Sequence, residues 1–294
     1  MHRRGLANYS CKLTPLRMRR VAVMKEQADD PTLLPPGRPR SSEAPDASAS
    51  VGASMFPDLA DRKMWYCLDR HKPTWRGKLH KWCALSSPVW VYYQLSLCSD
   101  WPSAIGASLA LFAALFLFSA SSSFHLGRWT QPQERWAMKV DYIAIFLQVG
   151  FSFAPLFVQL LRPATSYVIL ALLAAAVAAG AWLTLAEVNL GRHAVVFTYM
   201  AMAGVQLVPL STHLLSHRSA FEAMLPAETL MFFGMAACYV VGSQVYAHAA
   251  PPLWPDHFGY HELWHLLVSV ASFLSYACNC SVLMRCTADQ PCYK

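Results

Sequence analysis

Long runs of apolar residues, separated by short polar breaks, make up most of the chain after residue 81. About 20 apolar residues in a helix cross a bilayer core of roughly 30 Å, so runs of this length predict transmembrane helices. The first run is the shortest and contains the helix-breaking sequence Ser86-Ser87-Pro88. The seven runs cover residues 82–97, 103–124, 141–161, 164–186, 194–212, 227–246 and 262–283. The pattern predicts an all-α integral membrane protein with seven transmembrane helices.

The amino-acid composition favours a membrane protein over a soluble one. The 294 residues are 55% hydrophobic and 14% charged, whereas soluble domains carry about 25% charged residues. The charge is also segregated, since 16 of the 24 Lys and Arg residues lie at or before Lys81. We interpret the net charge of +7 as a signal of membrane topology and of contact with anionic lipid, and we expect no binding of nucleic acid.

Three regions of the chain differ in character. Residues 1–70 are basic and include a Pro-, Ser- and Ala-rich linker over 29–58, which predicts a largely disordered region. Residues 1–25 contain no apolar core of a signal peptide, and for them an Arg-rich transit peptide is the weaker alternative. Residues 71–286 hold the predicted helices, and 287–294 form a short tail. The nine cysteines do not suggest a disulfide scaffold.

Basic residues in the loops indicate the orientation of the chain. With a cytosolic N-terminus, the inner segments hold 20 Lys and Arg residues and the outer segments hold four. This distribution follows the positive-inside rule, although the N-terminal region dominates the count. We therefore expect a multi-pass protein with a cytosolic N-terminus. A disulfide such as Cys286 to Cys292 depends on whether the C-terminal end faces an oxidising compartment.

Polar residues gather at three ends of the predicted helices. Ionisable groups are costly inside a bilayer, so each is a functional candidate. The second helix ends with Ser121 and His125, the third begins with Asp141, and the seventh begins with His261 and His265. Counting crossings from a cytosolic N-terminus places all three ends at the inner face. We therefore expect these five side chains to converge.

The spacing of these residues fits a zinc site. His261 and His265 are four residues apart, so they project from one face of a helix about 6 Å apart, and Ser121 and His125 share a face in the same way. A hydrolytic zinc site needs three protein ligands and an open position for water. We predict that the three histidines bind Zn2+. Asp141 and Ser121 are then the candidate catalytic residues, which orient the water or the ligand rings.

Each residue also has an ordinary structural explanation. A single intramembrane histidine more often bonds between helices, Ser121 can bond to its own helix, and Asp141 can cap its helix. Convergence at one face favours the metal site. His213 and His217 share the four-residue spacing but fall at the opposite face.

The sequence His261-Glu262-Leu263-Trp264-His265 also matches the H-E-x-x-H pattern of zinc metalloproteases, in which the glutamate is the general base. That pattern requires a further ligand downstream. The only acid in the 29 residues after His265 is Asp289, which we expect across the membrane. A protease using Glu262 is therefore the least favoured interpretation.

The ordered combination of motifs resembles the hemolysin III and progestin-and-adipoQ-receptor (PAQR) family, which includes the adiponectin receptors. The resemblance covers roughly residues 70–285, from Ser121-x-x-x-His125 through Asp141-Tyr142 and the segment 150–155 to His261-x-x-x-His265. It implies zinc on the matching histidines near the cytoplasmic face, beside the matching serine and aspartate. It also implies hydrolysis of lipid amides such as ceramide, with receptor roles for some members.

Three functions are therefore compatible with the sequence. The first is a zinc-dependent lipid amidohydrolase, with a membrane lipid of the sphingolipid type as its candidate substrate. The second is a membrane receptor or signalling protein with a structural zinc site, and the third is the intramembrane protease. Neither a protein partner nor a particular membrane is indicated by the residues.

Overall fold

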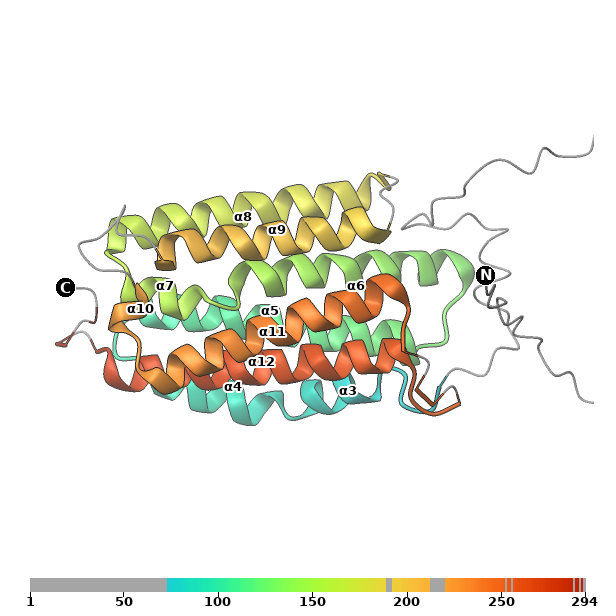
Figure 1. The fold of residues 1–294 in the computed structure, drawn as a ribbon, viewed down its shortest axis with the longest axis horizontal. Helices are drawn as coiled ribbons and strands as arrows, with labels where there is room; N and C mark the ends of the chain where they lie inside the picture. Colours follow the sequence, from blue (N-terminus) through green and yellow to red (C-terminus); the bar gives the residue numbers. More distant parts are fainter. Residues whose placement is uncertain are drawn as a thin grey trace, which may run out of the picture. The chain divides into compact units, whose positions relative to one another are not determined.

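The structure is a computed structural model that describes residues 73–188, 192–211, 220–251, 253–254, 256–287, 289–290 and 292. The predicted N-terminal region 1–70, with its linker, lies outside the described residues. The described part of the chain is built from helices (Figure 1), as expected for an all-α protein. The helices are α3 (Lys78–Leu85), α4 (Ser87–Ser96), α5 (Trp101–Leu126), α6 (Gln131–Phe151), α7 (Ala154–Leu160), α8 (Pro163–Leu185), α9 (Arg192–Ser211), α10 (Ala220–Ala223), α11 (Pro226–His248) and α12 (Tyr260–Arg285).

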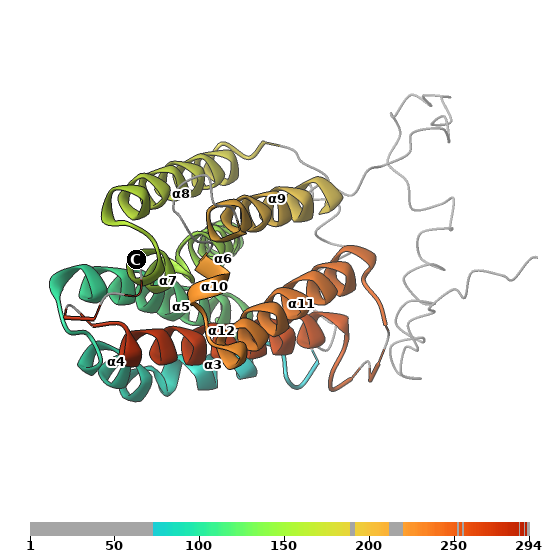
Figure 2. The same ribbon diagram turned by 60° about the vertical axis from the view of Figure 1, so that its left-hand side comes forward.

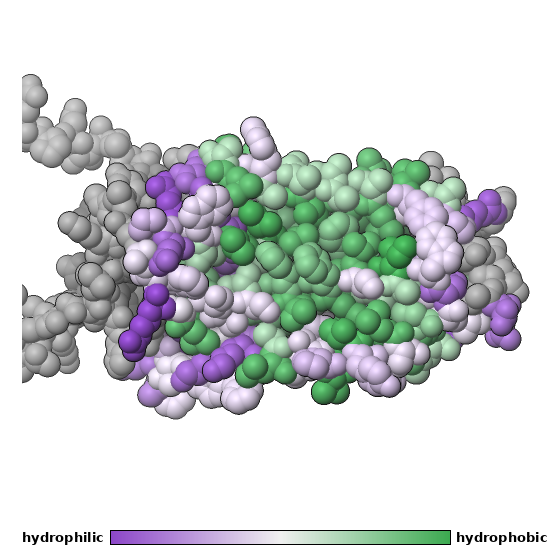
Figure 3. Space-filling model, turned by 180° about the vertical axis from the view of Figure 1, so that it is seen from behind, coloured by the Kyte–Doolittle hydropathy of each residue, from purple (hydrophilic) through white to green (hydrophobic). Residues whose placement is uncertain are grey.

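Five helical segments of the described chain are long and apolar enough to cross a membrane. They are Trp101–Leu126, Pro132–Leu160, Pro163–Leu185, Pro226–His248 and Tyr260–Arg285, and they confirm long apolar helices at the second, third, fourth, sixth and seventh predicted positions. An apolar band covers the middle of the surface in Figure 3, with polar residues at both ends. Large apolar side chains such as Val89, Leu172 and Leu230 are exposed, as expected for helices that face lipid.

The first and fifth predicted crossings differ from the simple prediction. The first is divided into α3 and α4 at Ser86, because Pro88 lacks a backbone N–H and its ring clashes with the preceding turn. Figure 1 shows the two halves end to end beside α12. The fifth predicted run is α9, of which His193–Leu207 is apolar but shorter than a full span.

The third crossing is longer than its apolar run and is broken. It begins at Gln131 instead of 141, because Thr130 and Gln133 form a capping box and Pro132 suits a first turn. It is interrupted after Phe151 and resumes as α7, with Pro155 in the first turn. The break exposes the carbonyl oxygen of Ser152, which accepts hydrogen bonds from two side chains of α12.

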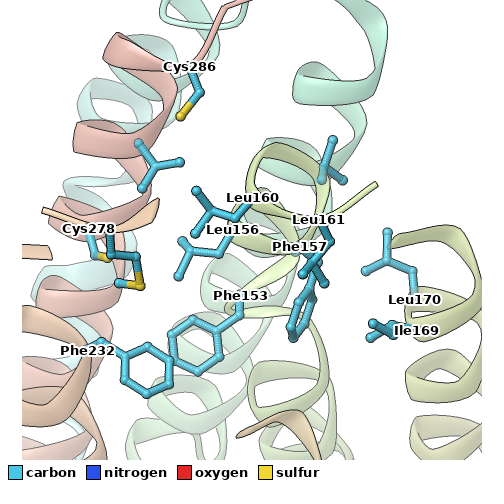
Figure 4. Close-up of a cluster of buried hydrophobic side chains, with 14 of the residues drawn as sticks. Phe153, Leu156, Phe157, Leu160, Leu161, Ile169, Leu170, Phe232, Cys278 and Cys286 are labelled. Atoms are coloured by element: carbon cyan, nitrogen blue, oxygen red, sulfur yellow. The ribbon is translucent and has the colours of Figure 1, made fainter. Parts of the chain in front are cut away.

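The main apolar core surrounds α7 and joins it to α8, α11 and α12 (Figure 4). Phe153 stacks on Phe232 with ring centroids 4.8 Å apart, and Leu156 and Phe157 are fully buried. Figure 2 shows α8 and α9 on one side of α6, with α12 and α3 on the other. Helix α6 therefore lies between two layers of helices. It packs closely against α5, α8 and α9, while α11 packs against α12.

The end of the bundle where α12 ends is fastened by covalent and ionic contacts. Cys286 and Cys292 form a disulfide, the bridge that the sequence left open. Beside it, Arg285 donates to the buried carboxylate of Glu228 at 2.6 Å and to the carbonyl of Ala223 at 2.7 Å. These contacts tie the start of α11 to the end of α12.

Candidate metal centre

Three histidines converge at the other end of the bundle. His125 lies in the last turn of α5, and His261 and His265 lie in the first two turns of α12. Their candidate ligand atoms all lie within 4.8 Å of one another. The Nε2 atoms of His125 and His261 are 3.2 Å apart. His125 and His265 are buried, and His261 is half-buried.

This cluster could hold a metal ion. Zinc–nitrogen bonds of about 2.0–2.1 Å in a tetrahedral site put neighbouring ligand nitrogens roughly 3.4 Å apart. The separation of 3.2 Å between His125 and His261 is close to this spacing, and the ligand atom of His265 lies within 4.8 Å of both. Imidazole is a ligand for Zn, Cu, Fe and Ni. The donor set therefore fits zinc without being specific to it.

The predicted aspartate and serine lie on the two helices beside this cluster. Ser121 is one helical turn before His125 on α5 and is 2% exposed. Asp141 is buried on α6, and its carboxyl interacts with the Ser121 side chain. The structure thus brings the five predicted residues to the same end of the bundle. The shared end follows from connectivity, because α5 ends there and α6 and α12 begin there.

Glu262 has a local role that the H-E-x-x-H spacing does not reveal. Its Oε2 accepts a hydrogen bond from the backbone N–H of Gly259 at 2.8 Å, which caps α12. Its Oε1 forms an ion pair with Arg76, which precedes α3. The Glu262 side chain is 1% exposed, so this buried carboxylate is held by a helix start and by a guanidinium.

The first turn of α3 also contacts the histidine cluster. The imidazole of His80 stacks on that of His265, with ring centroids 4.1 Å apart and an angle of 17° between the planes. Gly77 has a φ of 71°, and a Cβ atom there would lie 2.8 Å from the Cβ of His125. Only glycine suits both the left-handed conformation and the close approach.

The sequence analysis did not find Arg76, Gly77 or His80. A single histidine forms no motif with a recognisable spacing. The one signal for His80 in the sequence was therefore its position next to the inner end of the first predicted helix. These three residues contact Glu262, His125 and His265, which lie more than 40 positions later in the sequence. Their contacts therefore arise from tertiary packing.

A family model described as Haemolysin-III related matches residues 68–276. The match covers more than half of the chain and includes α3, α5, α6 and the start of α12. The chain belongs to the haemolysin-III-related family. The resemblance seen in the motifs is therefore confirmed.

In this haemolysin-III-related protein, the segment before α3 closes over the start of α12. The backbone N–H groups of Thr74 and Trp75 donate to the carbonyls of Asp256 and His257 at 3.1 and 3.2 Å. The Thr74 hydroxyl also lies 3.1 Å from Nδ1 of His257. Residues 74–77 therefore connect the loop before α12 with the end of α5.

Two basic residues of α6 lie at the same end but pair with an acid. Arg135 and Lys139 form ion pairs with Glu187, the latter at 2.6 Å. The hydrogen bond from Lys139 and the two positive charges hold the pKa of Glu187 below its usual value. His213 and His217, the other histidine pair with four-residue spacing, lie outside the described residues.

Proposed function

We propose that this haemolysin-III-related protein is a zinc-dependent hydrolase that cleaves an amide bond of a membrane lipid, as a ceramidase does. The observation that carries the proposal is the convergence of three imidazoles within 4.8 Å beside the buried Asp141–Ser121 pair. Three histidines with one position left for water are the ligand set of a catalytic zinc site. Zinc in such a site supplies Lewis acidity and an activated water at neutral pH.

The residues of the chain have distinct roles in this proposal. His125, His261 and His265 hold the ion. Asp141 is the carboxylate that accepts a proton during attack on the amide and returns it to the leaving amine. Ser121 orients the Asp141 carboxylate by donating its hydroxyl proton to it. Once Asp141 has taken up the proton from the attacking water, the same hydroxyl turns to donate to the oxygen that becomes negative.

The location of the cluster supports a lipid substrate. The histidines lie at the end of helices whose outer surfaces are apolar (Figure 3). Ser121 is one turn further from that end than His125, so polar groups extend from the cluster towards the apolar part of the bundle. An amphiphile whose amide lies near the headgroup would place its polar part here and keep its acyl chain in the bilayer.

In the proposed orientation, the histidine cluster lies on the cytosolic side of the membrane. The Cys286–Cys292 disulfide lies where α12 ends, opposite to the cluster. Disulfides persist in oxidising compartments, so the cluster belongs at the reducing, cytosolic side. This agrees with the excess of basic residues in the N-terminal region.

The contacts of Glu262 weigh against a protease. A general base needs a free carboxylate directed at water, whereas Glu262 binds the backbone of Gly259 and the guanidinium of Arg76. The match to H-E-x-x-H is better explained by helix capping between two ligand positions.

Purified protein in lipid nanodiscs tests the function directly. With ceramide in the nanodisc, we expect release of fatty acid that a chelator abolishes and added zinc restores. Asp141→Asn should reduce the rate by about 100-fold or more, as loss of a proton-transfer group does. Glu187→Gln, a matched change in an ion-paired acid at the same end, should retain activity. Zinc-loaded protein that releases no fatty acid from any of a panel of lipid amides would exclude this function.

A further inference from the structure

His80 is the one histidine of α3, and it is enclosed beside the candidate metal centre. Its side chain is 2% exposed and lies between the ring of His265 and the edge of Phe118, whose centroid is 5.2 Å away. The ring of a phenylalanine would fill the same volume without introducing polar atoms. The burial of an imidazole at this position therefore needs a polar reason.

Three ring nitrogens on the two stacked histidines are buried without a hydrogen bond of normal geometry to any described residue. They are Nδ1 and Nε2 of His80 and Nδ1 of His265, although the backbone of His265 lies near the His80 ring. Leaving a buried donor or acceptor unsatisfied costs roughly 1–3 kcal/mol. Parallel rings cannot bond to each other through their edges, so the three nitrogens need a third partner.

A metal-ligating histidine almost always donates its other ring N–H to an acceptor, which fixes the tautomer and the orientation of the ring. Among the described residues, the carboxyl of Asp141 interacts with Ser121 and that of Glu262 pairs with Arg76, and neither bonds to Nδ1 of His265. The rings of His80 and His265 are stacked with centroids 4.1 Å apart, a separation that one oxygen atom beside the ring edges can bridge. A buried water is stable when it has two to four polar partners.

We propose that His80 is a positioning residue of the metal centre, which holds one buried water together with Nδ1 of His265 and thereby fixes the orientation of the His265 ring. This proposal rests on metal binding by the three histidines, as in the proposed function, but not on the reaction. It explains why a histidine occupies the apolar site against Phe118. It also gives the first turn of α3 a role in the centre, beside the packing of Gly77 on His125.

The test is a comparison of full-length His80→Phe and His80→Gln proteins with the wild type. Phenylalanine keeps the flat ring and the packing but has no nitrogen, whereas glutamine keeps a polar group that can bind the water. Zinc affinity is measured by competition with a chelating dye, and the absorption spectrum of the cobalt(II)-loaded protein reports the ligand geometry. We expect His80→Phe to weaken zinc binding by roughly 10–100-fold and to change the cobalt spectrum, and His80→Gln to restore much of both. His248→Phe, at the same end but outside the cluster, is the matched control.

The outcomes separate this proposal from the proposed function. An unchanged affinity and cobalt spectrum in a folded His80→Phe protein would overturn the role of His80 while leaving the metal centre intact. Changed metal binding in His80→Phe, combined with a wild type that hydrolyses no lipid amide, would support His80 and reject the hydrolase. A wild type that binds neither zinc nor cobalt would overturn both proposals.

Discussion

Glu262 stands between two candidate metal ligands in the sequence, yet its carboxylate binds Arg76 and the backbone of Gly259. At the scale of one residue, the spacing of a motif predicts which side chains lie close together on a helix. It does not predict which group each side chain binds. The partner of Glu262 comes from a segment 186 positions away. Its assignment as cap and ion-pair acceptor therefore required the tertiary structure.

Glu262→Gln should act on stability more than on chemistry. The substitution keeps one acceptor for Gly259 but removes the charge that pairs with Arg76, so we expect the free energy of unfolding to fall by about 1–3 kcal/mol. Zinc content at a temperature where the variant is folded should equal that of the wild type. Thermal unfolding in detergent and metal analysis measure the two effects. A variant with unchanged thermal stability and no hydrolytic activity would instead identify Glu262 as the base.

The site residues that the sequence predicted depend on a different kind of information from those that it missed. The shared end of Ser121, His125, Asp141, His261 and His265 followed from the number of crossings, because each crossing of an antiparallel bundle alternates the end that the chain reaches. The contacts of Gly77 and His80 depend on how closely α3 approaches α5 and α12. No period or spacing in one sequence specifies that approach.

At the scale of elements, the break between α6 and α7 shows what apolar runs do not reveal. The sequence predicted one continuous helix over 141–161, and Pro155 interrupts it. In a membrane each freed backbone group needs a partner from the protein. Ser275 and Asn279, one turn apart on α12, supply it by donating to the Ser152 carbonyl at 3.1 and 3.0 Å. The polar side chains of α12 therefore supply the hydrogen bonds that the break between α6 and α7 removes.

Removal of both donors should cost more than the sum of the single changes. Ser275→Ala and Asn279→Leu each leave one hydrogen bond to Ser152, so each should cost less than about 1 kcal/mol of unfolding free energy. The double variant leaves a buried carbonyl unpaired and should cost about 1–3 kcal/mol beyond their sum. Denaturation of the detergent-solubilised protein measures these values, with the exposed Ser119→Ala as control. Strictly additive costs would show that Ser152 finds another donor.

At the scale of the whole molecule, contacts between side chains show which helices run from one end of the bundle to the other. Residues 76–80 lie at the histidine end, where Arg76 pairs with Glu262 and His80 stacks on His265. Helix α5 begins at the opposite end, since its last turn carries His125. The chain must therefore pass along the bundle through α3 and α4. The same reasoning applies to α9. Helix α8 ends at the histidine end, where Glu187 pairs with Lys139 of α6, and α11 starts at the disulfide end, where Arg285 binds Ala223. Helix α9 must therefore run between the two ends.

Seven crossings with a cytosolic N-terminus are thus predicted although only five described segments have full membrane length. Epitope tags at the N-terminus, between Leu97 and Trp101, between Ser211 and Ala220, and at the C-terminus distinguish the arrangements in intact cells. We expect the N-terminal tag to be reached by antibody only after permeabilisation, and the other three tags to be on the opposite side of the membrane. An N-terminal tag on the same side as the tag after α4 would mean that α3 and α4 do not cross.

A tag after α9 on the opposite side from the tag after α4 would mean that α9 does not cross. Helices α11 and α12 would then reverse and carry His261 and His265 away from His125. Because that outcome is incompatible with ligand atoms within 4.8 Å of one another, the tag after α9 tests the topology and the metal centre together.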